Sequence, residues 1–161
     1  MGWNPEVTVA AIVELDNRFL MVEERISGRL VLNQPAGHLE DDETLVEAVI
    51  RETREETAWR FRPDALVGTY LWRSPVDGRS FLRFAFCGTV DDHHAQQPLD
   101  KGILRALWMT HEQLLAQPSR LRSPMVLRCL QDFLLGKRQA LDTVACLGLE
   151  SALQMDAVVN L

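Results

Sequence analysis

Cysteine is scarce in this 161-residue sequence, and its placement excludes two common structural devices. The three residues, Cys87, Cys129 and Cys146, are odd in number and scattered, and they lack the short spacing of zinc ligands. A disulfide framework would need paired cysteines, and a zinc site would need clustered ones. The pattern therefore favours a reduced, cytoplasmic protein.

Long apolar runs and an excess of basic residues are also missing. No apolar run reaches the roughly 18 to 20 residues that span a bilayer, and the first six residues lack the pattern of a secretory signal. The 17 basic residues are outnumbered by 23 acidic ones, which gives a net charge of -6. We therefore expect no membrane and no nucleic acid polymer as partner, because polymer binding needs basic surface. A single small phosphate ester stays compatible, since a divalent cation can supply positive charge locally.

The hydrophobic pattern of the chain predicts strands first, one helix among them, and helices at the end. Expected strands lie at 7–15, 19–23, 30–33, 66–72, 80–90 and 103–109. Expected helices lie at 44–57, just after Thr110, and from Ser123-Pro124 to about 135, with 34–38 expected as an irregular turn. This order indicates an α/β fold, a mixed sheet between helices, in one domain of residues 1–161. Residues 141–161 are apolar enough for a helix but form an uncertain C-terminal extension.

The expected helix at 44–57 carries a core-facing stripe that changes from apolar to acidic. Its members, at three- and four-residue steps, are Leu45, Ala48, Val49, Glu52 and Glu56. Glu55 is three residues from Glu52, so three carboxylates gather at one end, where their like charges repel. A divalent cation would remove that repulsion, and oxygen ligands suit magnesium or manganese. Arg51 could pair with Glu47 or Glu55, and a solvated helix laced with such ion pairs is the alternative interpretation.

The spacing of these charged residues resembles the signature of the Nudix hydrolase family. That signature is a glycine, five residues, a glutamate, seven residues, then Arg-Glu-apolar-any-Glu-Glu-any-Gly-apolar. The matching positions here are Gly37, Glu43, Arg51, Glu52, Glu55 and Glu56. Thr53, Ala58 and Trp59 depart from the pattern, and Ala58 replaces a glycine where positive φ would cost alanine energy. Segments such as LNQPAGHLE and FLRFAF extend the similarity, over about 7–136, to a bacterial subgroup of phosphatases.

The resemblance implies a Nudix fold and assigns roles to residues of the signature. The implied metal ligands are Gly37 through its carbonyl, Glu52, Glu55 and Glu56, with Mg²⁺ as cofactor and Mn²⁺ as a possible substitute. The implied catalytic residues are Arg51, Glu52 and Glu55. Arg51 would orient a carboxylate, Glu52 would activate water, and Glu43 would support the helix entrance.

Residues outside the signature are candidates for the substrate side. Arg83 could bind phosphate or lie exposed on its strand, and Tyr70 and Trp72 could stack on a base or belong to the core. Gln34 and His38 flank the Pro-Ala-Gly turn; either could contact substrate, and a structural hydrogen bond is an equal alternative for His38. The resemblance implies that a further acid outside the signature often helps, and Asp100 is a candidate for it, although an ordinary loop aspartate is the favoured interpretation. His93 and His94 are interpreted as polar loop residues. The apolar set expected as core of the last helix is Met125, Leu127, Leu130, Phe133 and Leu134.

The wider resemblance implies a reaction. It predicts magnesium-dependent hydrolysis of phosphoanhydride bonds in nucleoside di- and triphosphates and in thiamine-type pyrophosphates, with release of orthophosphate. Two alternatives remain: a dinucleotide or sugar-nucleotide pyrophosphatase, and a non-catalytic nucleotide-binding sensor of the same fold. The complete acidic signature argues against the sensor. The expected partner is a small phosphoanhydride substrate, and the chain is expected to act as a monomer or homodimer.

Overall fold

The computed structural model describes residues 2–149, which form seven strands and three α-helices within that range. The strands are β1 (Glu6–Leu15), β2 (Arg18–Ile26), β3 (Arg29–Asn33), β4 (Ala36–His38), β5 (Arg60–Arg73), β6 (Ser80–Asp91) and β7 (Ile103–Met109). The helices are α1 (Leu45–Thr57), α2 (His111–Leu115) and α3 (Met125–Leu134), with short 3-10 turns at Pro118–Arg120 and Leu141–Thr143. In the described part of the chain, no helix is long and apolar enough to cross a membrane.

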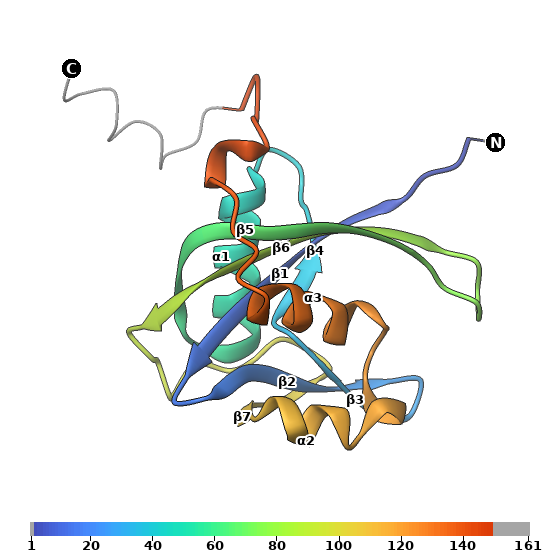
Figure 1. The fold of residues 1–161 in the computed structure, drawn as a ribbon, viewed down its shortest axis with the longest axis vertical. Helices are drawn as coiled ribbons and strands as arrows, with labels where there is room; N and C mark the ends of the chain where they lie inside the picture. The colour runs from blue at the N-terminus through green and yellow to red at the C-terminus, as the bar shows by residue number, and fades with distance from the viewer. Residues whose placement is uncertain (1, 150–161) are drawn as a thin grey trace.

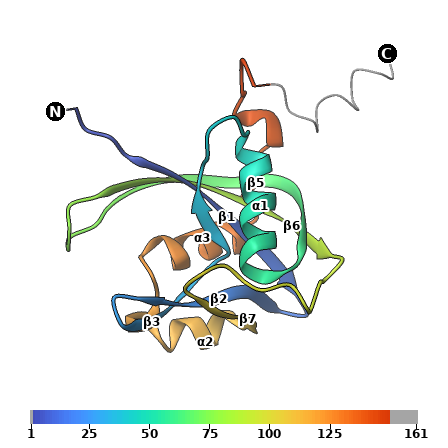
Figure 2. The ribbon, with the colours of Figure 1, turned by 180° about the vertical axis from the view of Figure 1, so that it is seen from behind.

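The strands form a mixed sheet between helices, which confirms the expected α/β fold. Their order is β3-β2-β1-β6-β5, with β4 added to β1 and β7 added to β2. The β1–β6 pair is parallel, whereas the other strand pairs among the described residues are antiparallel. Helix α1 covers one face of the sheet formed by β1, β5 and β6, and α3 covers the other face (Figures 1 and 2).

Two apolar cores follow from the two-residue alternation of β1. Val9, Ala11 and Val13 are buried toward α1, where Ala48 and Val49 pack. Their neighbours Ala10 and Ile12 are buried in the opposite core, with Val126, Cys129 and Leu130 of α3. A strand buried on both faces reads as a continuous apolar run, which explains why the segment lacks polar alternation.

Helix α1 has well-defined ends that fix where its acidic end lies. Thr44 and Glu47 form a reciprocal capping box at the start. Ala58 caps the other end in the left-handed region, with φ 61° and ψ 11°. The expected positive φ at the residue that replaces glycine is therefore confirmed.

Three local predictions need correction. The segment expected as an irregular turn contains β4, because Ala36–His38 pairs with β1 and long-range pairing overrides local turn propensity. β5 begins at Arg60 rather than near 66 and accommodates Pro63 beside a bulge at the sheet edge. In α3, Leu134 is 49% exposed rather than core, and the fully buried Val126 and Cys129 were missed.

Residues 141–161 are apolar enough for a helix and were expected to form an uncertain C-terminal extension. Within the described residues, 141–149 contains a 3-10 turn at Leu141–Thr143 and no α-helix. The remainder of that prediction, 150–161, lies outside the described residues.

Candidate active site

The acidic stripe of α1 is buried as the periodicity predicts. Leu45, Ala48 and Val49 face the core, and Glu52 and Glu56 continue the stripe with only 8% and 7% of their surfaces exposed. Glu55 is partly buried beside them. Carboxylates in such positions are costly unless a cation or hydrogen-bond donors compensate their charge. The solvated-helix interpretation therefore does not fit this end of α1.

Arg51 is the main donor to the carboxylates around it. Its guanidinium makes two hydrogen bonds to Glu43, at 2.9 Å from Nε and 2.7 Å from Nη2. Nη1 donates to Glu52 Oε1 at 2.9 Å and to Glu55 Oε2 at 3.1 Å, and Nη2 donates to the His38 carbonyl at 3.0 Å. Arg51 thus ties the helix entrance, β4 and two acidic side chains into one network.

Gly37 is required by the closeness of β4 to α1. A Cβ atom at this position would lie 2.1 Å from Glu52 Cδ and 2.2 Å from its Oε1, so any side chain would displace the carboxylate. The neighbouring Ala36 donates its backbone N–H to Glu56 Oε2 at 3.0 Å. The start of β4 therefore brings backbone polar groups directly to the glutamates.

Asp100 joins the site from the loop between β6 and β7. Single carboxylate oxygens of Glu52, Glu55 and Asp100 all lie within 4.8 Å of one another. The sequence favoured an ordinary loop residue at Asp100, because neither periodicity nor spacing relates it to α1. The structure brings it to the signature glutamates, a relation that only the tertiary fold reveals.

The glutamates of the site differ in their ionisation. Burial raises the pKa of Glu52, although Arg51 opposes the shift, and burial raises the pKa of Glu56 to about 9. By contrast, the Arg51 guanidinium holds the pKa of Glu43 below its ordinary value. A divalent cation would favour the carboxylate forms, so the donor set fits a hard cation such as Mg²⁺ or Mn²⁺.

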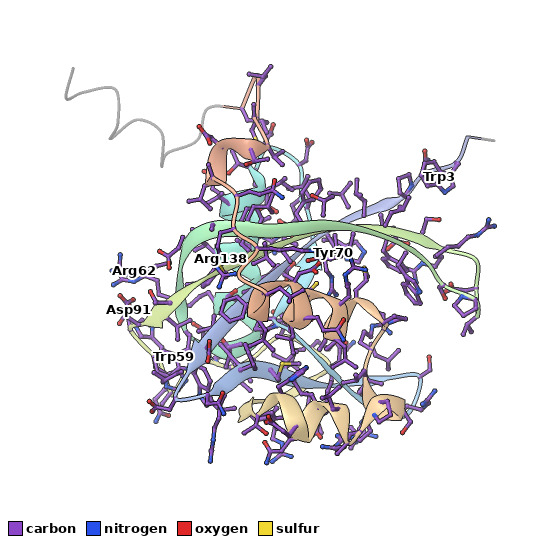
Figure 3. The ribbon with its side chains drawn as sticks, in the orientation of Figure 1. Trp3, Trp59, Arg62, Tyr70, Asp91 and Arg138 are labelled. Atoms are coloured by element: carbon purple, nitrogen blue, oxygen red, sulfur yellow. The ribbon has the colours of Figure 1, made fainter. Side chains whose placement is uncertain are left out.

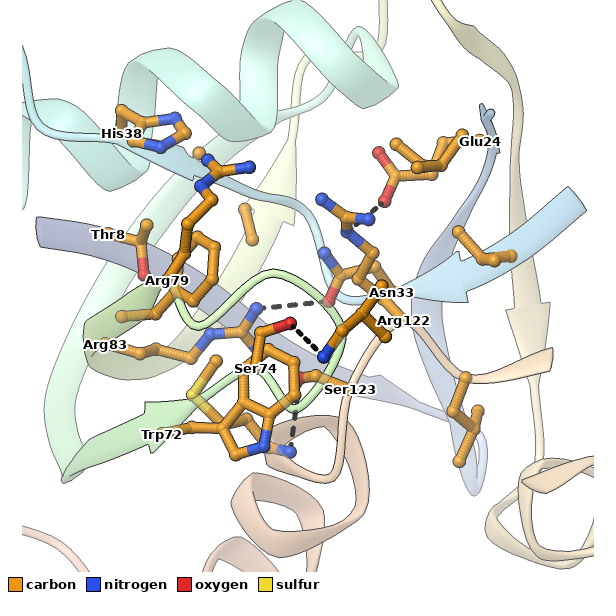
Figure 4. Close-up of a pocket in the computed structure, with 18 of the residues that line it drawn as sticks. Thr8, Glu24, Asn33, His38, Trp72, Ser74, Arg79, Arg83, Arg122 and Ser123 are labelled. Carbon is orange, nitrogen blue, oxygen red and sulfur yellow. Dashed lines mark hydrogen bonds and ion pairs between the residues drawn. The ribbon is translucent and has the colours of Figure 1, made fainter. Parts of the chain in front are cut away.

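A cleft of about 630 Å³, shown in Figure 4, adjoins the acidic site. Gly37, Glu52 and Glu56 belong to its lining. Elsewhere it is lined by Arg83, Trp72 and residues that the sequence did not single out, including Thr8, Asn33 and Phe81. This volume lies in the usual range of small-molecule pockets, about 300 to 1,000 Å³. The acidic site and a substrate-sized space are therefore continuous.

Arg83 is buried in the cleft wall, with 4% of its surface exposed. Its guanidinium donates to Gln34 Oε1 at 3.1 Å and to Asn33 Oδ1 at 3.3 Å, as Figure 4 shows for Asn33. Gln34 is fully buried and donates to the Val126 carbonyl at 2.8 Å, so it supports Arg83 from behind and is absent from the cleft lining. Thr8 of β1 is paired with Arg83 across the sheet. Two buried atoms of this pair, Arg83 Nε and Thr8 Oγ1, have no hydrogen-bond partner among the described residues.

The other substrate-side candidates separate into different environments. Trp72 lines the cleft and stacks on Phe81, with ring centroids 5.7 Å apart. Tyr70 projects toward α3 (Figure 3), and its hydroxyl donates to Asp132 Oδ2 at 2.9 Å. His38 lies at the cleft rim with Nε2 2.6 Å from Glu6 Oε2, so the structural hydrogen bond considered from sequence is present.

His93 and His94 lie outside the acidic cluster. The ring of His93 stacks on Trp59 at a centroid distance of 4.4 Å, and His94 contacts Arg54 and Asp92. Both histidines therefore make contacts within or beside the loop that contains Asp100, as the interpretation of them as loop residues predicts.

A carboxylate cluster beside a substrate-sized cleft is the arrangement expected of a Nudix hydrolase, and the chain belongs to the Nudix hydrolase family. The NUDIX domain model of that family matches residues 4–128. Phosphatase NudJ of Escherichia coli strain K12 is 42% identical over 142 residues, which cover 88% of this chain and 92% of that protein. The chain is accordingly an enzyme that hydrolyses pyrophosphate linkages in small molecules, and the similarity to a bacterial phosphatase subgroup is confirmed.

Solved structures agree with this assignment. A NUDIX hydrolase from Nitrosomonas europaea superposes with a TM-score of 0.85 at 43% identity, over 86% of this chain and 95% of that one. A MutT NUDIX hydrolase from Burkholderia pseudomallei has a TM-score of 0.67 at 18% identity, over 80% of this chain and 98% of that one. The second comparison supports the fold alone.

Proposed function

We propose that this enzyme hydrolyses phosphoanhydride bonds of nucleoside di- and triphosphates and of thiamine-type pyrophosphates, with Mg²⁺ as cofactor and orthophosphate as product. The observation that carries the proposal is the grouping of Glu52, Glu55 and Asp100 oxygens within 4.8 Å, beside a cleft that contains Arg83. The similarity to Phosphatase NudJ supports release of a phosphate group rather than cleavage between two nucleosides.

The metal-binding residues in this proposal are those that converge at the end of α1. They are Glu52, Glu55, Glu56, Asp100 and the carbonyl of Gly37. A divalent cation bound there would neutralise phosphate oxygens and lower the pKa of an attacking water. The close approach of Gly37 to Glu52, where a Cβ would lie 2.1 Å from Cδ, supports a site built for carboxylate ligands.

The protein's own groups position the reactants. Arg51 donates to both Glu52 and Glu55 and so fixes the carboxylates in the orientation that they need. Glu52 would accept the proton of the attacking water. Arg83 would donate to an oxygen of the substrate's phosphate chain, and the Trp72 ring would stack on its heterocycle.

Arg83→Lys tests the substrate side of this proposal. Lysine keeps the positive charge but loses the Nε–H and the planar guanidinium held by Asn33 and Gln34. We expect kcat/KM to fall about 10- to 100-fold, mainly through KM, because hydrogen bonds to charged groups contribute roughly 1.5 to 3 kcal/mol. Steady-state kinetics measures this change. The matched control is Arg105→Lys, at an exposed arginine on β7 paired with Glu23 and outside the cleft; an unchanged KM in Arg83→Lys would remove Arg83 from substrate binding.

Product analysis tests the reaction itself. Thiamine pyrophosphate, nucleoside di- and triphosphates and a dinucleoside pyrophosphate would each be incubated with the enzyme and Mg²⁺. We expect orthophosphate from the first two groups and none after chelation. Cleavage of the dinucleoside compound alone would show a different substrate class, and tight nucleotide binding without turnover would indicate a sensor.

A further inference from the structure

The carbonyl groups at the end of α1 are bound by the loop that follows β6. The last carbonyls of a helix have no partner within the helix and need donors from elsewhere. Here the Arg54 carbonyl, which also accepts the N–H of the cap residue Ala58 at 2.9 Å, accepts from Gln97 Nε2 at 2.7 Å, and the Glu55 carbonyl accepts from the Asp100 N–H at 3.0 Å. The carbonyl of the cap residue Ala58 accepts from the His94 N–H at 3.0 Å. The loop is therefore attached to the helix end at three points.

Arg54 adds a fourth attachment through its side chain. Nη1 donates to the Asp92 carbonyl at 2.8 Å and to the Ala58 carbonyl at 3.3 Å. Nη2 lies 2.7 Å from His94 Nδ1. One guanidinium thus joins the end of α1 to the first residues of the loop. Arg54 occupies a position that the family signature leaves free, so the signature does not account for these contacts.

The loop needs such attachment because Asp100 is exposed and close to two other carboxylates. Like charges at this separation repel one another, and an unrestrained loop would let Asp100 turn toward solvent. The contact of its own N–H with the Glu55 carbonyl fixes the backbone, but only if residues 92–99 hold the loop against the helix.

We propose that Arg54 and Gln97 are positioning residues, which clamp residues 92–100 onto the end of α1 and thereby hold Asp100 beside Glu52 and Glu55. The inference rests on the proposed function, because it assumes that Asp100 helps to bind the cation. Arg54 and Gln97 act on the cation only through Asp100. Their substitution should therefore matter while Asp100 is present and have no further effect once its carboxylate is removed.

A double-mutant cycle on the full chain tests the clamp. Mn²⁺ binding to metal-stripped protein would be measured by calorimetry for the parent enzyme, Arg54→Ala, Asp100→Asn and the double variant. We expect each single substitution to weaken Mn²⁺ binding by about 10-fold, the scale seen when a metal ligand loses its support. The double variant should bind as Asp100→Asn does, because the two substitutions remove the same contribution. The Mg²⁺ concentration for half-maximal turnover should rise in parallel.

Two further variants separate the clamp from general stability. Gln97→Ala removes a single loop contact and should weaken Mn²⁺ binding in the same direction, even if Arg54→Ala folds poorly. Arg138→Ala is the matched control, because Arg138 donates to the Phe133 carbonyl at 3.1 Å, at the end of α3 rather than α1. Its Mn²⁺ affinity should equal that of the parent enzyme.

The possible results distinguish the clamp from the function on which it rests. Multiplicative effects of Arg54→Ala and Asp100→Asn, or unchanged affinity in Arg54→Ala and Gln97→Ala, would overturn the clamp. Unchanged affinity in Asp100→Asn, with affinity lost in Glu56→Gln, would also overturn it while leaving the rest of the metal site in place. Undiminished Mn²⁺ binding in both Asp100→Asn and Glu56→Gln would instead overturn the proposed metal site.

Discussion

Glu56→Gln should lower magnesium-dependent turnover by more than about 100-fold, since loss of mere support for a metal ligand already costs roughly 10- to 100-fold. The fold should survive, because glutamine has nearly the same shape and can still accept the Ala36 N–H that now bonds Oε2 at 3.0 Å. Burial raises the pKa of Glu56 to about 9, so an uncharged side chain suits this position in the protein alone. Turnover, Mn²⁺ affinity and thermal unfolding would be compared with those of the parent enzyme.

Glu47→Gln is the matched control for this substitution. It makes the same chemical change on the same helix, where Glu47 accepts the Thr44 N–H at 2.8 Å as part of the capping box. Glutamine also serves in a capping box, so turnover should stay close to that of the parent enzyme. Turnover like the parent's in a folded Glu56→Gln variant would remove Glu56 from the metal site.

Gly37→Ala should abolish most activity by displacing a carboxylate rather than by removing one. The new Cβ would lie 2.1 to 2.3 Å from Cδ and both oxygens of Glu52. Either the Glu52 side chain or β4 must move. Glu52 is itself a proposed metal ligand, and β4 contributes the proposed carbonyl ligand of Gly37. We expect turnover to fall by at least about 100-fold and Mn²⁺ affinity to fall with it. Kinetics and calorimetry on the folded protein would measure the two effects.

Gly88→Ala distinguishes damage to the site from damage to the fold. A Cβ there would lie 2.0 Å from the Arg62 carbonyl oxygen on β5, an equally severe clash outside the cleft lining. It should lower the unfolding temperature but leave the Mg²⁺ requirement of the folded enzyme unchanged. Activity of Gly37→Ala comparable to the parent's would show that Glu52 tolerates displacement and does not act where we place it.

The acidic end of α1 could be predicted from sequence because helical periodicity is a local property. Glu52 and Glu56 follow Ala48 and Val49 at helical steps, so their burial required no knowledge of the sheet. The pairing of Arg51 was only partly predictable. Its contact with Glu55 follows from four-residue spacing, whereas its two bonds to Glu43 depend on the path of the chain before the helix.

The contribution of Asp100 could not be predicted from spacing. Its approach depends on hydrogen bonds between a loop and the carbonyl groups of Arg54, Glu55 and Ala58, and backbone acceptors leave no trace in the sequence. The cap residue of α1 offers one weak signal, since Ala58 ends the helix in the left-handed region and its carbonyl accepts the His94 N–H. Tertiary contacts of this kind are the main limit of reasoning from one sequence.

Strand alternation predicted only in part which residues of β5 line the cleft. Tyr70 and Trp72 share a face of β5, but they meet different neighbours because β5 and β6 extend beyond α3 (Figure 1). Tyr70 lies over Asp132 of α3, while Trp72 lies over Phe81 in the extended hairpin. Gly68 leaves room for the Tyr70 hydroxyl, which lies 2.5 Å from where a Cβ would be. The shared face was therefore predictable, and the division of roles was not.

The most direct test of the central claim is a magnesium titration of metal-stripped enzyme with a nucleoside diphosphate, followed by orthophosphate release. The account predicts no release without the cation, a saturable rise as Mg²⁺ is added, and loss of that rise in Glu56→Gln. Orthophosphate release that persists with excess chelator, or a Glu56→Gln titration that matches the parent's, would contradict the assignment of catalysis to the carboxylates at the end of α1.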